Sequence, residues 1–254
     1  MPAGFLDFPT PVAFAHRGGA GHFPENSWRA FEHAVGLGYA YLETDAHATS
    51  DGVLVAFHDR QLDRVTDRSG AIAAMPYRDV AAARIAGTDP IPRLEDLLTA
   101  WPGVRFNIDV KDAPAARPLA DLVRRAGAWD RVCITSFSAR RLAATRRLLD
   151  RPVCMATSPV GAAALRSGLP SRALAPAFAS RYVRCAQLPI GLATGPVIGR
   201  AHAAGLQVHV WTVNERHLME SLLDLGVDGI MTDQTELLRD VMVTRGQWHP
   251  RQEA

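Results

Sequence analysis

The chain has 254 residues, a length at which one large hydrophobic core is still possible. Apolar residues make up 48% of it and charged residues 21%, which is typical of a soluble globular protein and excludes a disordered one. Because 28 Lys and Arg stand against 26 Asp and Glu, no strong positive field indicates a polyanionic partner, and we expect no nucleic-acid binding.

The cellular compartment of the protein can be predicted from targeting signals and from the cysteine pattern. The amino terminus has no basic segment followed by a long apolar stretch, and no apolar run approaches the roughly 18 residues that span a bilayer. Cys133, Cys154 and Cys185 are odd in number and form no C-x-x-C pair, which favours a reducing compartment. We therefore expect a cytoplasmic protein without an integral membrane segment, in which Cys133 and Cys154 pack as small hydrophobes.

Short apolar runs typical of strands alternate along the chain with segments of helical period, such as Trp28, Phe31 and Val35. The strand-like runs cover residues 12–15, 41–45, 53–58, 104–111, 132–136, 153–156, 206–212 and 227–232. The segment 167–192 has no clear pattern, and we place one further strand in it, at 173–177. Alternation with short links predicts a parallel sheet, and eight such units in this length favour a closed (β/α)₈ barrel, the TIM barrel.

We expect one domain over residues 1–254. Residues 59–89 break the alternation with a polar turn and a short helical piece, and they are predicted to form an insertion after the 53–58 strand. Residues 246–254 are expected to form a frayed tail.

Polar residues stand at the ends of several predicted strands: His16, Arg17, Glu43, Asp45, His58, Asp59, Asp109 and Lys111. In a parallel barrel the carboxyl ends of the strands form one rim, where the reactive groups of such folds lie. Because side chains at i and i+2 share a face, Glu43 and Asp45 are expected to point together, as are Asp109 and Lys111. The sequence therefore predicts one polar cluster at this rim.

Three converging carboxylates, those of Glu43, Asp45 and Asp109, are unfavourable unless a cation or protons neutralise them. Oxygen ligands without cysteine suit Mg²⁺ or Ca²⁺ better than Zn²⁺. We therefore expect one divalent cation. The alternative is that Lys111 and Arg17 pair with the acids and that no metal binds.

His16 and His58 each follow an apolar run directly. Histidine titrates near neutrality, so one of them could remove a proton while the other donates one. A metal, Arg17 and Lys111 could stabilise the equatorial oxygens of a phosphoryl group in transfer. By contrast, His209 is expected to pack inside the barrel rather than to act in catalysis. Asp233, at the end of the last predicted strand, is expected to make a structural hydrogen bond to the Gly18–Gly19 loop.

Short motifs along the chain occur in one characteristic order. They are Ala15-His16-Arg17-Gly18-Gly19, Pro24-Glu25-Asn26-Ser27, Glu43-Thr44-Asp45, Phe57-His58-Asp59, Ile91-Pro92-Arg93-Leu94-Glu95, Trp211-Thr212-Val213-Asn214 and Gly226-Val227-Asp228-Gly229-Ile230-Met231-Thr232-Asp233. Together, from residue 12 to about residue 238, they make the chain resemble the glycerophosphodiester phosphodiesterase family.

The resemblance implies a TIM barrel that hydrolyses glycerophosphodiesters, which are small molecules, to sn-glycerol 3-phosphate and an alcohol with a divalent metal. It implies a cyclic phosphate, formed when the glycerol 2-hydroxyl attacks phosphorus and then opened by water. Carried over by position, the resemblance makes His16 and His58 the general acid/base pair, and it makes Glu43, Asp45 and Asp109 the metal ligands. It makes Arg17 and Lys111 the phosphate contacts and Trp211 a wall of the glycerol pocket. Glu25 is a further residue of the family's site motif and is grouped with the substrate contacts.

Two residues depart from the family pattern. Ser27 stands where threonine is commoner, a mild change if its hydroxyl caps a helix. Asp109 stands where many members carry glutamate, so its shorter arm is expected to reach the metal directly or through water. Three alternatives remain: a lysophospholipase D, a phospholipase-type enzyme on the same barrel, and a non-catalytic barrel that binds phosphate ligands.

Overall fold

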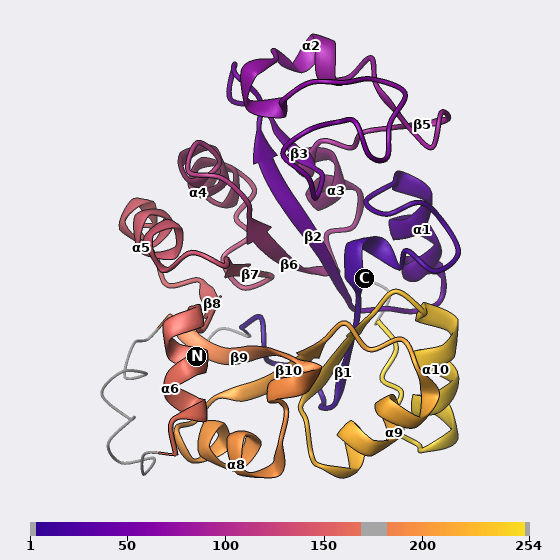
Figure 1. The fold of residues 1–254 in the computed structure, drawn as a ribbon, viewed down its shortest axis with the longest axis vertical. Helices are drawn as coiled ribbons and strands as arrows, with labels where there is room; N and C mark the ends of the chain where they lie inside the picture. The colour runs from indigo at the N-terminus through magenta and orange to yellow at the C-terminus, as the bar shows by residue number, and fades with distance from the viewer. Residues whose placement is uncertain (1–3, 169–181, 252–254) are drawn as a thin grey trace.

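Eight parallel strands close into a barrel in the computed structural model, which describes residues 4–168 and 182–251 (Figure 1). They are β1 (Val12–Ala15), β2 (Tyr41–Ala48), β6 (Arg105–Val110), β7 (Val132–Thr135), β8 (Cys154–Ala156), β9 (Val183–Pro189), β10 (Gln207–Trp211) and β11 (Gly229–Thr232). Closure is complete because β1 pairs in parallel with β2 on one side and with β11 on the other. The predicted (β/α)₈ barrel is confirmed.

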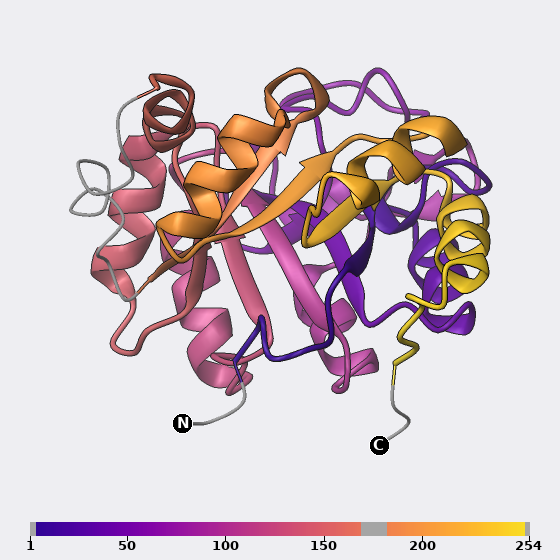
Figure 2. The same ribbon diagram turned by 90° about the horizontal axis from the view of Figure 1, so that it is seen from below.

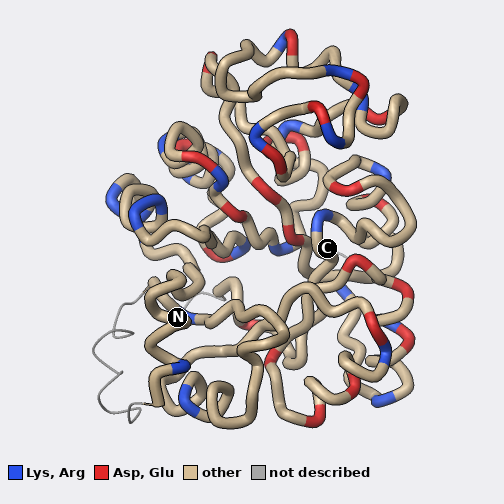
Figure 3. The backbone as a smooth tube through the Cα atoms, in the orientation of Figure 1, with Lys and Arg blue, Asp and Glu red and all other residues tan. Residues whose placement is uncertain are grey.

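Helices surround the barrel, and the described chain begins and ends on the same side of it (Figure 2). They are α1 (Trp28–Gly36), α3 (Leu94–Ala100), α4 (Ala116–Arg125), α5 (Ala139–Leu148), α6 (Pro159–Arg166), α8 (Gly195–Ala203), α9 (Arg216–Asp224) and α10 (Thr235–Thr244), with single 3₁₀ turns η1 (His16–Gly18) and η3 (Ile190–Leu192). Acidic and basic residues are interspersed along α1, α4, α9 and α10, whereas α5 carries only basic ones (Figure 3). No helix in the described ranges is both long enough and apolar enough to cross a bilayer.

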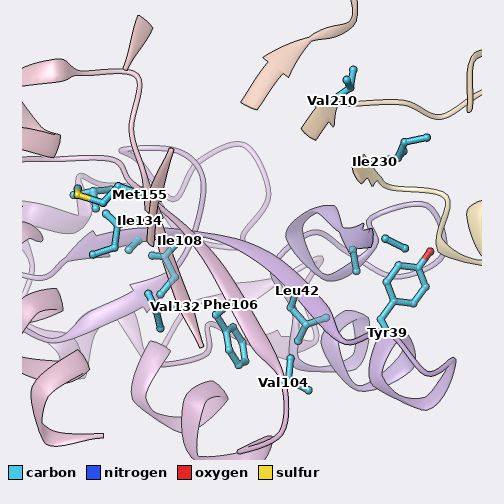
Figure 4. Close-up of a cluster of buried hydrophobic side chains, with 14 of the residues drawn as sticks. Tyr39, Leu42, Val104, Phe106, Ile108, Val132, Ile134, Met155, Val210 and Ile230 are labelled. Carbon is cyan, nitrogen blue, oxygen red and sulfur yellow. The ribbon is translucent and has the colours of Figure 1, made fainter. Parts of the chain in front are cut away.

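The main core lies between the barrel and the helices. Strand β6 illustrates the arrangement, because Phe106, Ile108 and Val110 belong to this core while Asn107 and Asp109 lie on the opposite face, inside the barrel. Figure 4 shows Ile108 beside Ile134 of β7, and Phe106 nearer to Val132 of the same strand. In β6, alternation of apolar and polar residues thus separates a face that packs against helices from a face toward the interior.

The 53–58 run is not a barrel strand, and this prediction was wrong. Only Leu54–Ala56 is extended, as β3, and it pairs antiparallel with the end of β2, which runs beyond the barrel to Ala48. The following insertion contains η2 (Ile72–Ala74), α2 (Tyr77–Val80), β4 (Arg84–Ile85) and β5 (Asp89–Pro90), and it lies outside the ring in Figure 1. It buries an apolar cluster of its own, with Phe57, Leu62 and Ile72.

The barrel strand missing from the prediction is β9. Its sequence includes Arg184, Gln187 and Pro189, so it shows no continuous apolar run. The strand expected at 173–177 lies outside the described residues. At the carboxyl end, Trp248 packs edge-on against the ring of Tyr39 and the Arg251 amide donates to Gly38, so residues 246–251 are held against the barrel.

Candidate active site

The predicted polar cluster forms at the carboxyl rim of the barrel. Strand register places Glu43 beside Asn107 and Asp45 beside Asp109. One cavity of about 710 Å³ is lined by eight of the nine predicted site residues: His16, Arg17, Glu43, Asp45, His58, Asp109, Lys111 and Trp211. Residues from both ends of the chain thus meet in one pocket.

His16 is held between two carboxylates. Its Nδ1 lies 2.7 Å from Oδ1 of Asp233, and its Nε2 lies 3.8 Å from Oε2 of Glu43. Burial disfavours the charged imidazole, but Glu43 and Asp233 outweigh it and raise the pKa of His16 above its ordinary value. The Asp233 contact fixes Nδ1 as the protonated nitrogen and leaves Nε2 toward the cavity.

His58 has the same kind of partner. Its Nδ1 lies 2.6 Å from Oδ1 of Asp59, whose other oxygen accepts from Arg64. The Arg64 hydrogen bond lowers the pKa of Asp59 to about 2, so this carboxylate stays charged at neutral pH. Although His58 does not follow a barrel strand, the β2–β3 pairing carries it to the rim. Two histidines, each oriented by an aspartate, therefore face one cavity.

Lys111 bridges two of the carboxylates. Its Nζ lies 2.9 Å from Oδ1 of Asp45 and 2.7 Å from Oδ2 of Asp109. Burial favours protonated Asp45, but Lys111 and Arg17 outweigh it and lower the pKa of this carboxyl. Asp45 also accepts a hydrogen bond from the buried Asn26 amide.

The negative charge of the Glu43 carboxylate is less well balanced by neighbouring positive charges. The carboxylate accepts from the backbone N–H of Arg17, yet burial and the neighbouring Asp45 charge raise its pKa to about 7. The other oxygen of Asp109, Oδ1, is buried with no hydrogen-bond partner, and burial raises the pKa of this carboxyl too. More negative charge is therefore gathered here than the two cations neutralise.

The donor set fits a divalent cation. All three carboxylates offer hard oxygen ligands, the Asp109 Oδ1 atom is unpaired, and Glu43 lacks a full counter-charge. The oxygens are not gathered around one point, since within residues 4–168 and 182–251 no three carboxylates or imidazoles place their ligand atoms within 4.8 Å of one another. Cation binding would therefore require Lys111 to move from between Asp45 and Asp109.

Glu25 is the exception among the predicted site residues, because it does not line the cavity. Its Oε1 accepts from Arg17 at 3.0 Å and from Arg64 at 2.6 Å. The structure therefore places Glu25, which the sequence grouped with the substrate contacts, behind Arg17 and not in the cavity wall. Its carboxylate connects the guanidinium beside the cavity to the one that holds Asp59.

Ser27 and Asn26 support the loop that carries Glu25. The Ser27 hydroxyl accepts from Ala30 N at 3.2 Å and caps α1, as expected for the serine that departs from the family pattern. Asn26 accepts from the Thr44 hydroxyl while donating to Asp45. The loop is thereby tied to the strand that carries the carboxylates.

Sequence reasoning missed the role of Asp233. We expected its side chain to bond the Gly18–Gly19 loop. Instead that loop contacts the Asp233 backbone, whose carbonyl accepts from Gly21, while the carboxylate binds His16 and Asn214. Its position directly after the last strand was the available signal. Phe137 was also missed; it lies edge-on to Trp211, with centroids 5.4 Å apart, in the cavity wall.

Residues 16–237 match the profile of the glycerophosphoryl diester phosphodiesterase family. The chain belongs to this family. A Mycobacterium tuberculosis protein named "Probable glycerophosphodiester phosphodiesterase 2" is 46% identical over 96% of this chain and 95% of its own. A human lysophospholipase D is 27% identical over 90% of this chain and 85% of its own.

Solved structures agree on the fold. A putative glycerophosphoryl diester phosphodiesterase from Agrobacterium tumefaciens superposes with a TM-score of 0.81 at 23% identity, covering 94% of this chain and all of that one. An Oleispira antarctica phosphodiesterase, in complex with its product sn-glycerol-3-phosphate, gives 0.79 at 21% identity, covering 92% and 97%. The family predicted from the sequence motifs is confirmed.

Proposed function

We propose that the chain hydrolyses glycerophosphodiesters to sn-glycerol 3-phosphate and an alcohol, with His16 and His58 as the acid/base pair. The observation that carries this proposal is the pair of aspartate-oriented histidines on one cavity with three carboxylates and two cations. Family membership and the names of the relatives support the substrate class.

The histidines move protons in two steps. In the first, one imidazole takes the proton of the glycerol 2-hydroxyl as its oxygen bonds to phosphorus, and the other gives a proton to the alcohol oxygen as its P–O bond breaks. In the second, the roles reverse, because water loses a proton as it attacks the cyclic phosphate and the 2-oxygen regains one. Asp233 and Asp59 hold the imidazoles in the tautomer that exposes Nε2.

Arg17 and Lys111 are the side chains that hold the phosphate. Both line the cavity between the histidines, and their charges match the negative charge that a phosphodiester carries in the ground and transition states. Glu43, Asp45 and Asp109 would hold Mg²⁺ or Ca²⁺, which would supply charge stabilisation to a phosphoryl oxygen. Trp211 and Phe137 form an aromatic wall for the glycerol carbons.

Activity measurements test this proposal. Glycerophosphocholine and glycerophosphoethanolamine, assayed with a coupled enzyme for glycerol 3-phosphate, are expected to turn over with Mg²⁺ or Ca²⁺. Turnover should be lost in EDTA and in His16→Ala and His58→Ala. Unchanged turnover in either variant would contradict the assignment, and binding without product release would instead favour the non-catalytic barrel.

A lysophospholipase D activity is the second candidate. One side of the cavity is apolar, with Pro159, Leu192 and Phe137, and Phe137 is 62% exposed. Such a wall could contact an acyl chain, and the human relative is a lysophospholipase D. Rates on glycerophosphocholine and on long-chain lysophosphatidylcholine, measured side by side, distinguish the two: a preference for the lysolipid that Phe137→Ser abolishes would favour this candidate.

A further inference from the structure

Three cysteines from neighbouring strands meet inside the barrel, away from the catalytic rim. Cys133, Cys154 and Cys185 lie on β7, β8 and β9, which are adjacent in the sheet (Figure 1). The Cys133 and Cys185 sulfurs are 3.9 Å apart, and all three Sγ atoms lie within 4.8 Å of one another. All three cysteines are free.

A histidine lies against this cluster. His209 of β10 is fully buried, and its Nδ1 has no hydrogen-bond partner, while its Nε2 contacts Gln207. The neighbouring thiols of Cys133 and Cys154, and then the nearby His209, lower the pKa of Cys185. A buried imidazole nitrogen without a partner is costly, so a ligand for it would remove a penalty.

A reciprocal amide pair separates this cluster from the catalytic cavity. Asn107 and Gln187 exchange hydrogen bonds across the barrel, at 2.7 and 3.3 Å, and both line that cavity. Cys185 lies two residues before Gln187 on β9, toward the amino end of the strand, and none of the three cysteines lines the cavity. The sulfur cluster is therefore independent of the carboxylate site.

The spacing suits a tetrahedral metal. With Zn–S bonds of about 2.3 Å, tetrahedral geometry separates the sulfurs by about 3.8 Å. One pair already has this separation, and the remaining ones need to close by about 1 Å at most. Barrel interiors are usually filled by bulky branched side chains, so three clustered thiols depart from ordinary packing.

We propose that Cys133, Cys154 and Cys185 form a binding site for one thiophilic cation of the Zn²⁺ class. His209 would complete it as the fourth ligand by moving toward the sulfurs, since neither of its ring nitrogens lies within 4.8 Å of all three. Each thiol gives its proton to solvent as its sulfur bonds the metal, the imidazole binds as the neutral base, and no redox change occurs. Mg²⁺ and Ca²⁺, which prefer oxygen, are not bound here. The partly exposed Cys154 marks the side from which the cation would enter.

Co²⁺ is a suitable probe because its absorption spectrum reports directly on the ligands that bind it. The full chain is produced in minimal medium with Co²⁺ in place of Zn²⁺, and its absorption spectrum is recorded under a phosphine reductant. Thiolate coordination gives a sulfur-to-cobalt charge-transfer band and intense tetrahedral d–d bands, neither of which the carboxylate site can produce. We expect one Co²⁺ per chain at this site, displaced by Zn²⁺ and not by Mg²⁺.

Matched variants distinguish metal binding at the cysteine site from metal binding at the carboxylate site. Cys185→Ala and Cys154→Ala should lose the charge-transfer band, and Asp109→Asn should keep it. Zn²⁺ should raise the Tm of the wild-type protein and of Asp109→Asn, but not that of Cys154→Ala, whose partly exposed position makes it the safer variant for folding. Absence of the band in reduced wild-type protein, or its persistence in a folded Cys185→Ala or Cys154→Ala variant, would overturn the proposal.

Discussion

Nδ1 of His16 lies 2.7 Å from Oδ1 of Asp233, although 217 residues separate the two in the sequence. The cause is barrel closure, because Ala15 at the end of β1 pairs with Thr232 at the end of β11, and His16 and Asp233 are the next residues on each strand. The same register that completes the sheet therefore builds the contact that orients His16, one of the two histidines proposed as the acid/base pair.

Asp233→Asn is expected to lower kcat by roughly 100-fold or more, with a much smaller change in KM. The amide cannot stabilise an imidazolium and permits the wrong tautomer of His16, whereas the substrate contacts remain. Steady-state kinetics on glycerophosphocholine measure the effect.

Asp228→Asn is the matched control for that variant. Asp228 precedes β11 as Asp233 follows it, and it also pairs with a histidine, His202, at 2.7 Å but outside the cavity. Its kinetics should stay near wild type even if its Tm falls. Equal losses of kcat in the two variants would show that Asp233 acts through stability alone.

The fold was predictable because most barrel strands carry continuous apolar runs. The exception shows the limit of this signal: β9 places Cys185 and Gln187 in the interior and ends in Pro189, so local hydrophobicity does not reveal it. The reverse error at β3 has a similar cause. An antiparallel strand buried under an insertion has the same local composition as a barrel strand, and only its pairing with β2 distinguishes the two.

The candidate site was predictable where strand parity applies. Glu43 and Asp45 share a face because they are two residues apart on one strand. Lys111 pairs with Asp45 and Asp109, and such pairing was one of the two arrangements that the sequence left open for the acids. The contact between Glu25 and Arg64 depends on how a loop and an insertion pack together, which no local pattern encodes. The orienting contact of Asp233 depends on closure of the whole barrel.

Substrates with different leaving groups should distinguish the role of His16 from the role of His58. We expect His58 to protonate the leaving alcohol, because its side chain is 33% exposed, against 16% for His16, and a variable head group must extend toward solvent. His58→Ala should therefore lose about 100- to 10,000-fold on glycerophosphocholine and recover much of it on a p-nitrophenyl ester of glycerol phosphate, whose leaving group needs no acid.

His16→Ala should be impaired on both of those substrates, since removal of the 2-hydroxyl proton is still required. The readout is the ratio of the two kcat values for each variant. If His16→Ala were the variant rescued by p-nitrophenol, the two roles would be exchanged.

Asp109→Asn should weaken the activating cation. The substitution removes a buried charge and leaves one oxygen in place of the two of the carboxylate, whose Oδ1 is unpaired, while keeping the size of the side chain. We expect the Mg²⁺ or Ca²⁺ concentration for half-maximal activity to rise on the order of 10- to 100-fold. Titration of EDTA-treated enzyme measures this, and Asp112→Asn, at a nearby acid that pairs with His47 outside the cavity, is the control. An unchanged metal requirement in Asp109→Asn would remove Asp109 from the ligand set.

Glu25→Gln should raise KM more than it lowers kcat. Glu25 does not line the cavity, but its carboxylate holds Arg17 and Arg64, so the neutral amide should leave Arg17, the proposed phosphate contact, less fixed. For a partly exposed ion pair we expect an effect of about five-fold on KM. Glu95→Gln, which weakens an exposed pair with Arg125 on the outer surface, should leave both constants unchanged. A loss confined to kcat in Glu25→Gln would instead mean that Glu25 acts on the reacting atoms, and its assignment as a positioning residue would fail.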